Sequence, residues 1–195
     1  MKMFSKLPLR ILGLVVVLLA TSWSINAQEA ARLRLDGLDK LATNSAHKLS
    51  FDLNGRLLQL AIRALSSGDA NDPKMVKIRE AVQGLKGIYA RSFEFEADNA
   101  YAAADLEDVR TQLRSGTWER LAGIQSKKDG QNIEVFTMFE GDRIGGLTVL
   151  ATDTRHVSVV NIVGMIDLEK LMTLQGNFGI PNVNITLPIK IKTKP

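Results

Sequence analysis

Four consecutive apolar-rich segments joined by short turns lie between Trp118 and Gly164, and residues 132–140 alternate between apolar faces as a strand does. These segments cover residues 118–126, 132–140, 144–152 and 156–164, and an alternation with a period of two is typical of half-buried strands. An Asp-Gly pair at 129–130 separates the first two segments and is a strong hairpin signal. Polar turns at 141–143 and 153–155 separate the others. The pattern predicts an antiparallel meander of four strands.

The chain before the meander mixes two periodicities. Residues 48–53 and 88–96 alternate as strands do, whereas residues 56–65 and 101–113 repeat their apolar positions at helical spacing. Asp72 and Pro73 predict the start of another helix, and Leu38 and Leu41 a short one near the start. After the meander, Asp167 is a candidate N-cap for a helix that includes Leu168, Leu171 and Met172. Segregated strands of this kind indicate an α+β fold, a mainly antiparallel sheet with helices packed on one face.

The N-terminus has the layout of a targeting segment. Three basic residues, Lys2, Lys6 and Arg10, precede an unbroken apolar run at residues 11–20. Ala27 then offers a small residue at a cleavage position. This layout predicts a secretory signal peptide over residues 1–27 and a periplasmic or secreted location in a bacterial envelope. The alternative is an uncleaved membrane anchor. Residues 11–25 number 15, whereas a membrane span needs roughly 20.

The mature chain is expected to hold a single domain. We place a lead-in segment at residues 28–47, one α+β domain at 48–181 and an extended tail at 182–195. The tail alternates apolar and polar residues, but Pro188 confines any strand there to a sheet edge. A docked arm and a free tail both stay open.

Charge and cysteine content exclude several classes of function. The chain has 25 basic and 21 acidic residues, and removal of the three basic residues of the signal leaves 22 against 21. Such a balance gives no electrostatic footprint for nucleic acid. The chain has no cysteine, so disulfides, thiol catalysis and a lipid anchor on cysteine are excluded.

No pattern of catalytic residues stands out. The two histidines, His47 and His156, lack the paired spacing of a zinc protease, and no Gly-x-Ser-x-Gly elbow supports a hydrolase triad. His156 follows Arg155 and is interpreted as a solvated turn residue. We therefore predict no catalytic, cofactor-binding or metal-binding residue.

Two acidic groups invite a test for calcium. Asp69, Asn71 and Glu80 match the first, third and twelfth positions of a calcium loop, but Lys74 stands where that loop requires glycine. The segment is interpreted instead as a polar loop that caps a helix. A second group, Glu94, Glu96 and Asp98, alternates along a strand end, and a solvated acidic face explains it better than a metal site.

Gly145 and Gly146 form the only glycine pair in the meander. A phosphate-binding loop would need further glycines, a lysine and a following helix. The pair lies at the entry to a strand, which favours a β-bulge or the close approach of another backbone.

The last predicted strand is apolar on both faces from Val157 to Ile166. If helices cover one face of the sheet, the second face needs a cover of its own. The C-terminal tail could supply it within the chain, and the alternative is a protein partner or self-association through that second face.

Five stretches resemble a family of exported bacterial proteins catalogued as a domain of unknown function, number forty-two fifty-two. They are residues 53–61 (LNGRLLQLA), 85–95 (LKGIYARSFEF), 118–121 (WERL), 142–147 (DRIGGL) and 160–171 (VNIVGMIDLEKL). The resemblance covers most of residues 38–181. It implies a periplasmic or envelope location and carries no activity or catalytic residue. It also suggests genes near sigma and anti-sigma factors, and hence envelope sensing.

Three functions are compatible with these patterns. We expect first a non-enzymatic envelope domain that works by protein–protein contact, in stress signalling or quality control. The second is a small-molecule or lipid-binding module, with the ligand between the sheet and a helix. The third, from another class, is a hydrolase that uses carboxylates such as Glu94 or Glu96.

Overall fold

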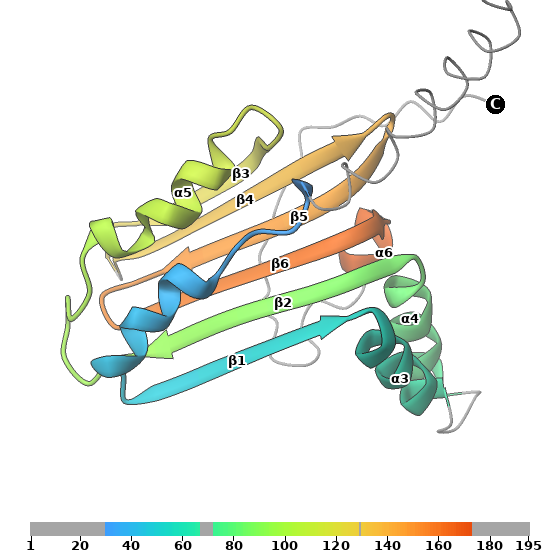
Figure 1. Ribbon diagram of the computed structural model, residues 1–195, viewed down its shortest axis with the longest axis horizontal. Coiled ribbons are helices and arrows are strands. Elements are labelled where there is room, and N and C mark those ends of the chain that lie inside the picture. Colours follow the sequence, from blue (N-terminus) through green and yellow to red (C-terminus); the bar gives the residue numbers. More distant parts are fainter. Residues whose placement is uncertain (1–29, 67–71, 129, 173–195) are drawn as a thin grey trace, which may run out of the picture.

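A computed structural model describes residues 30–66, 72–128 and 130–172, and a six-stranded antiparallel sheet forms its centre (Figure 1). The strands are β1 (His47–Asn54), β2 (Leu85–Glu94), β3 (Glu119–Ser126), β4 (Gln131–Glu140), β5 (Arg143–Thr152) and β6 (His156–Ile166). Their order in the sheet is β1-β2-β6-β5-β4-β3. The predicted meander is therefore confirmed, and its last strand, β6, pairs with β2 in the middle of the sheet.

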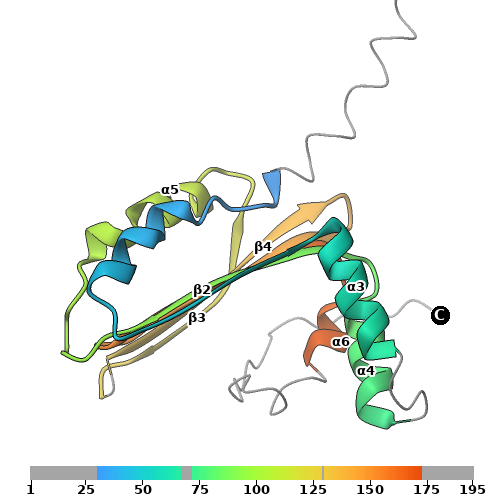
Figure 2. The ribbon, with the colours of Figure 1, turned by 60° about the horizontal axis from the view of Figure 1, so that its bottom comes forward.

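Helices cover both faces of this sheet. The first face carries the 3-10 helices η1 (Asp36–Thr43) and η2 (Ala103–Leu106) with α5 (Glu107–Leu113). The second face carries α3 (Gly55–Ser66), α4 (Pro73–Val82) and α6 (Leu168–Met172) at one end (Figure 2). The α+β class is confirmed, but the expectation that helices pack on one face is wrong. Because β6 presents apolar residues to both sides, each face requires its own cover.

The first face holds the larger apolar core. Among its fully buried side chains are Leu38, Phe93, Phe95, Leu106, Val109, Leu150, Val157 and Val159. Phe95 also stacks on Tyr101 with 5.4 Å between ring centroids. The short helix expected near Leu38 is η1, and it brings Leu38 and Leu41 into this core. The lead-in segment thus supplies part of the core of the sheet.

Apolar residues form cross-strand rows on the second face. One row joins Leu53, Ile88, Ile162 and Leu147, and the next joins Phe51, Ala90, Val160, Val149 and Val135. The first row lies in a cluster with Leu58 of α3, Val82 of α4 and Leu168 of α6. These three helices therefore cover the end of the second face at which β1 finishes.

The glycine pair of β5 serves packing. The pairing register shifts between Ile144 and Gly146, as the predicted bulge requires. A Cβ on Gly146 would lie 2.9 Å from the Trp118 ring and 3.1 Å from Ala31. The expected bulge is confirmed. The expected approach of another backbone is wrong, because the atoms nearest to a Cβ at Gly145 or Gly146 belong to side chains.

Several predictions fall on parts of the chain outside the described residues. These are the signal peptide at 1–27, the loop that holds Asp69 and Asn71, and the tail at 182–195. Within the ranges 30–66, 72–128 and 130–172, no helix combines the length and the apolar content needed to cross a bilayer.

A substitution of Gly164 tests how closely β6 packs against the turn before β2 and the start of β2. Gly164 has a φ of +127°, and a Cβ there would lie 2.6 Å from both the Gly84 carbonyl oxygen and the Lys86 nitrogen. We expect Gly164→Ala to lower the free energy of unfolding by about 3 kcal/mol, because strain and a backbone clash add together. Urea denaturation of the purified protein measures the loss.

Gly141→Ala is the matched control for this substitution. Gly141 also has a positive φ, +62°, but a Cβ there meets nothing within 4 Å, so the expected loss is about 1 kcal/mol. Equal losses for the two variants would contradict the close approach at Gly164.

Candidate functional site

A segment of the chain outside the regular helices and strands, residues 31–35, crosses β5 and β6 on the first face, and we call it the strap (Figure 1). Its side chains alternate between buried and exposed. Ala31, Leu33 and Leu35 are buried in the first-face core, whereas Arg32 and Arg34 are exposed. The strap thus has the alternation of a strand, although it lies across the sheet and not at its edge.

The side chain of Asn161 holds one half of the strap. Asn161 lies on β6 and is 0% exposed. Its Oδ1 accepts a hydrogen bond from the Leu33 N–H at 3.0 Å, and its Nδ2 donates to the Ala31 carbonyl at 3.0 Å and to the Thr148 hydroxyl at 3.1 Å. A side-chain amide has one acceptor and one donor group, as a peptide unit does. Asn161 therefore pairs with the strap as the backbone of a neighbouring strand would.

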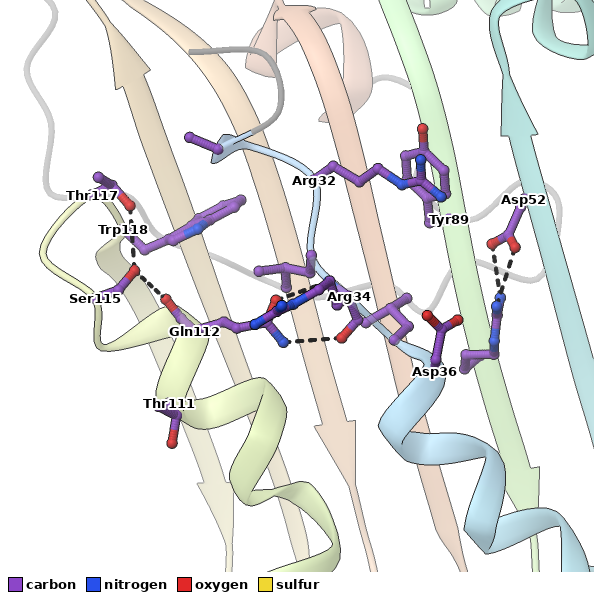
Figure 3. A pocket seen from close by; sticks show the side chains of 14 residues that line it. Arg32, Arg34, Asp36, Asp52, Tyr89, Thr111, Gln112, Ser115, Thr117 and Trp118 are labelled. Carbon is purple, nitrogen blue, oxygen red and sulfur yellow. Dashed lines mark hydrogen bonds and ion pairs between the residues drawn. The ribbon is translucent and has the colours of Figure 1, made fainter. Parts of the chain in front are cut away.

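Gln112 of α5 holds the other half in the same way (Figure 3). Its Oε1 accepts from the Arg34 N–H at 2.8 Å, and its Nε2 donates to the Arg34 carbonyl at 3.0 Å. Two side-chain amides, one in the sheet and one in α5, thus bond to the Ala31 carbonyl, to the Leu33 N–H and to both backbone groups of Arg34. This pairing allows the segment to be buried without a strand partner.

A groove with a volume of about 750 Å³ runs beside the strap. Several of its polar side chains are engaged within the protein. The Arg32 guanidinium lies 4.5 Å from the centre of the Tyr89 ring, and buried Arg91 donates to Asp52 at 2.8 and 3.1 Å. The hydrogen bonds from Arg91 lower the pKa of the Asp52 carboxyl. The groove is organised chiefly to hold the strap.

The edge strand β1 has a different character. Leu49 and Phe51 point from β1 to the second face and are 57% and 37% exposed. In the helix that follows, α3, Leu57 and Leu60 are 54% and 57% exposed. We call these four residues the β1–α3 surface. In the described parts of the chain, five large hydrophobic side chains are exposed, and four of them belong to this surface. The remaining one is Phe139.

Both histidines lie in one cross-strand row next to this surface. His47 of β1 and His156 of β6 flank Glu94 of β2. The His156 Nδ1 lies 2.9 Å from Asp153 Oδ1, and its Nε2 lies 3.8 Å from Glu94 Oε1. Burial by itself raises the pKa of Asp153, but hydrogen bonds from the Arg155 N–H and from His156 lower it overall. His156 is a half-exposed residue beside a turn, as its sequence position indicates.

The predicted acidic group does not converge on a cleft. The side chains of Glu94 and Asp98 are 53% and 66% exposed, and Glu96 is exposed as well. None of the three lines the groove. Glu80 lies on α4 and its predicted companions fall outside the described residues. Among the residues that the structure describes, no three histidine or carboxylate side chains are grouped to hold a metal ion.

The side-chain amides of Asn161 and Gln112 hold the strap, and we call them the two clamps. The sequence did not predict either of them. Asn161 offered a signal, because it is a polar residue in the middle of an apolar central strand. Gln112 offered none, since a glutamine on a helix is normally solvated.

Comparison with known families decides the relationship of the chain. Residues 43–174 match the family described as Domain of unknown function (DUF4252). The chain belongs to this family. The match begins at the end of η1 and ends just after α6, so it contains the whole sheet and leaves the strap outside. No curated protein and no solved structure matches the chain.

Asn161 provides a direct test of the strap. We expect Asn161→Ala to lower the free energy of unfolding by about 3 kcal/mol, because the Leu33 N–H and the Ala31 carbonyl lose their buried partner. Release of the strap would also expose the backbone after Arg32 and Arg34 to trypsin, and limited proteolysis with mass spectrometry measures this cleavage.

Asn132→Ala is the matched control for that variant. Asn132 lies on β4, and its side-chain nitrogen makes one long contact of 3.4 Å with Glu134. The control should keep the strap protected from trypsin. If Asn161→Ala were as resistant as the control, the clamp would not hold the strap.

Proposed function

We propose that this protein is exported to the bacterial envelope and acts there as a non-enzymatic module that binds another protein through the β1–α3 surface. The observation that carries the proposal is the concentration of exposed large hydrophobic residues on two consecutive elements. Leu49, Phe51, Leu57 and Leu60 all expose more than a third of their surface. Such a cluster on a soluble domain is typical of an interaction site.

The geometry of β1 supports the same function. It lies at an edge of the sheet, so one side of its backbone has no partner strand among the described residues. Its register with β2 runs without interruption from the His47–Glu94 pair to the Asn54–Gly87 pair. An extended segment of a partner could therefore add to β1 through main-chain hydrogen bonds, while Leu49 and Phe51 contact its side chains.

The location in the envelope rests on the first 27 residues. A basic start, an apolar run and a small residue at the cleavage position support export. An envelope domain without enzymatic groups suits a role in stress signalling or quality control, where recognition of a partner is the activity.

The groove beside the strap favours a second candidate, the binding of a small molecule or lipid. Its volume of about 750 Å³ is within the range of ligand sites. This candidate has weaker support than the β1–α3 surface, because Arg32, Arg91 and Gln112 already have partners within the chain.

Photocross-linking in cells tests the proposed function. A photoreactive phenylalanine analogue at position 51, in the full chain with its N-terminal segment, should give covalent protein adducts in the envelope fraction. The analogue at position 139 is the matched control, because Phe139 is also an exposed phenylalanine, at 48%, but lies on β4.

Two results would contradict the proposal. Adducts of equal yield from positions 51 and 139 would show that exposure alone causes the cross-links. Recovery of the protein only from the cytoplasm would contradict export, and N-terminal sequencing of the exported form should begin at Gln28 if the signal is cleaved after Ala27.

A further inference from the structure

We infer that the partner of β1 is the β1 strand of a second copy of this chain, paired antiparallel about a twofold axis at Ser50. The inference rests on the proposed function and names its partner. It would join two six-stranded sheets into one continuous sheet. Three properties of β1 carry it: the direction of its backbone groups, the placement of its charges and the position of its exposed apolar residues.

Hydrogen bonds at the end of β2 show which backbone groups of β1 point away from β2. The Phe95 N–H donates to the Arg155 carbonyl across the β2–β6 pair, whereas the Glu94 carbonyl accepts from Ala46 on the β1 side. Backbone groups alternate in direction along an antiparallel strand. The even-numbered residues of β2 therefore bond to β1, and their partners in β1 are the odd-numbered residues. Lys48, Ser50 and Asp52 consequently direct their N–H and C=O groups away from the sheet.

The other edge strand, β3, is protected against pairing. Its register with β4 shifts between Arg120 and Ala122, and the Arg120 side chain folds over Gly123. A bulge of this kind is a device that prevents a sheet edge from pairing. In β1 no bulge, proline or glycine interrupts the eight residues. The regular edge at β1 is therefore the one that can accept a strand.

The charges of β1 select one register. Because the groups that point away from β2 belong to even-numbered residues in both copies, an even residue must lie opposite an even residue. A twofold axis at Ser50 places Lys48 opposite Asp52 of the second copy, and this happens twice in the dimer. An axis at Lys48 or at Asp52 would instead place like charges opposite each other, which is destabilising. An axis at Leu49 or at Phe51 would place Lys48 or Asp52 opposite Ser50, so that the pair between Lys48 and Asp52 would be lost.

The groups around these charges can accommodate the new pairs. Lys48 already lies 2.9 Å from Asp39, and Asp52 accepts two hydrogen bonds from Arg91. A carboxylate has about four acceptor positions, so Asp52 can also accept from the lysine of the second copy. All these side chains lie on the first face, away from the exposed apolar residues.

The same register brings the apolar residues together on the second face. Leu49 comes to lie opposite Phe51 of the second copy, so that two apolar pairs flank the twofold axis. The end of β1 in one copy lies beside the start of β1 in the other. Since α3 follows the end of β1 on the second-face side (Figure 2), the helix that carries the exposed Leu57 and Leu60 lies on the same side of the sheet as these apolar pairs.

A single engineered cysteine tests both the pairing and its register. The chain has no cysteine of its own, so Ser50→Cys would carry the sole thiol. Residues that exchange both backbone hydrogen bonds lie about 5.5 Å apart between Cα atoms, which a disulfide can bridge. We expect the full-length Ser50→Cys chain to form a disulfide-linked dimer in the envelope, seen by non-reducing electrophoresis.

Asn54→Cys is the register control for this test, because Asn54 also lies on β1 but takes no part in the charge pairs. In the inferred register the two copies of position 54 lie eight residues apart along the strands, about 27 Å, which no disulfide spans. A dimer from Ser50→Cys and none from Asn54→Cys supports the inference. No dimer from Ser50→Cys, or equal amounts from both variants, would overturn it.

A second pair of variants tests the backbone hydrogen bonds. Ser50→Pro removes an N–H that points away from β2, whereas Ser50→Ala keeps it. The dimer loses two hydrogen bonds in Ser50→Pro, so its dissociation constant in analytical ultracentrifugation should rise at least about tenfold, with little change for Ser50→Ala. Equal dissociation constants would overturn the inference, and circular dichroism checks that the proline variant stays folded.

The cross-link from position 51 separates the inference from the proposed function. An adduct with twice the mass of the chain supports self-pairing. Adducts with other proteins alone would overturn self-pairing and leave the proposed interaction function standing. The absence of any adduct would overturn both.

Discussion

One buried side-chain amide, that of Asn161, joins the N-terminal strap to the middle of the sheet. An unpaired amide at this position would be costly, because the interior offers no water to replace the lost hydrogen bonds. The strap provides the partners through the Leu33 N–H and the Ala31 carbonyl. The centre of the sheet is therefore complete only when the strap is in place. This dependence also fixes the packing of Trp118 and Gly146, which lie beside Ala31.

The strap would also link the fold to the export that we propose. Only residues 28–30 separate the predicted cleavage position from Ala31, which is 1% exposed. Cleavage at that position would leave three residues before Ala31. If the signal were retained as an anchor, the same three residues would hold the first face of the sheet close to the membrane. In both cases the β1–α3 surface projects from the far edge and the opposite face.

The sequence predicted the strands well because their signals are local. The alternation of apolar residues and the polar or Asp-Gly turns predicted the order of β3 to β6 and nearly their bounds. Asp167 caps α6 as expected, because its Oδ1 accepts a hydrogen bond from the Lys170 N–H. The placement of helices on both faces could not be predicted in this way, because it depends on which long-range contacts each face offers. The clamps escaped prediction for the same reason. Asn161 and the strap are 128 residues apart at the Leu33 contact, and no local pattern reports such a pair.

Hydrogen exchange at the amide of Leu33 tests the central claim most directly. If the strap is part of the folded sheet, this amide should exchange only when the domain unfolds, with protection similar to that of the amides in β6. Exchange at the rate of an unstructured segment, while the amides of β6 remain protected, would contradict the claim that the strap and the sheet form one cooperative unit.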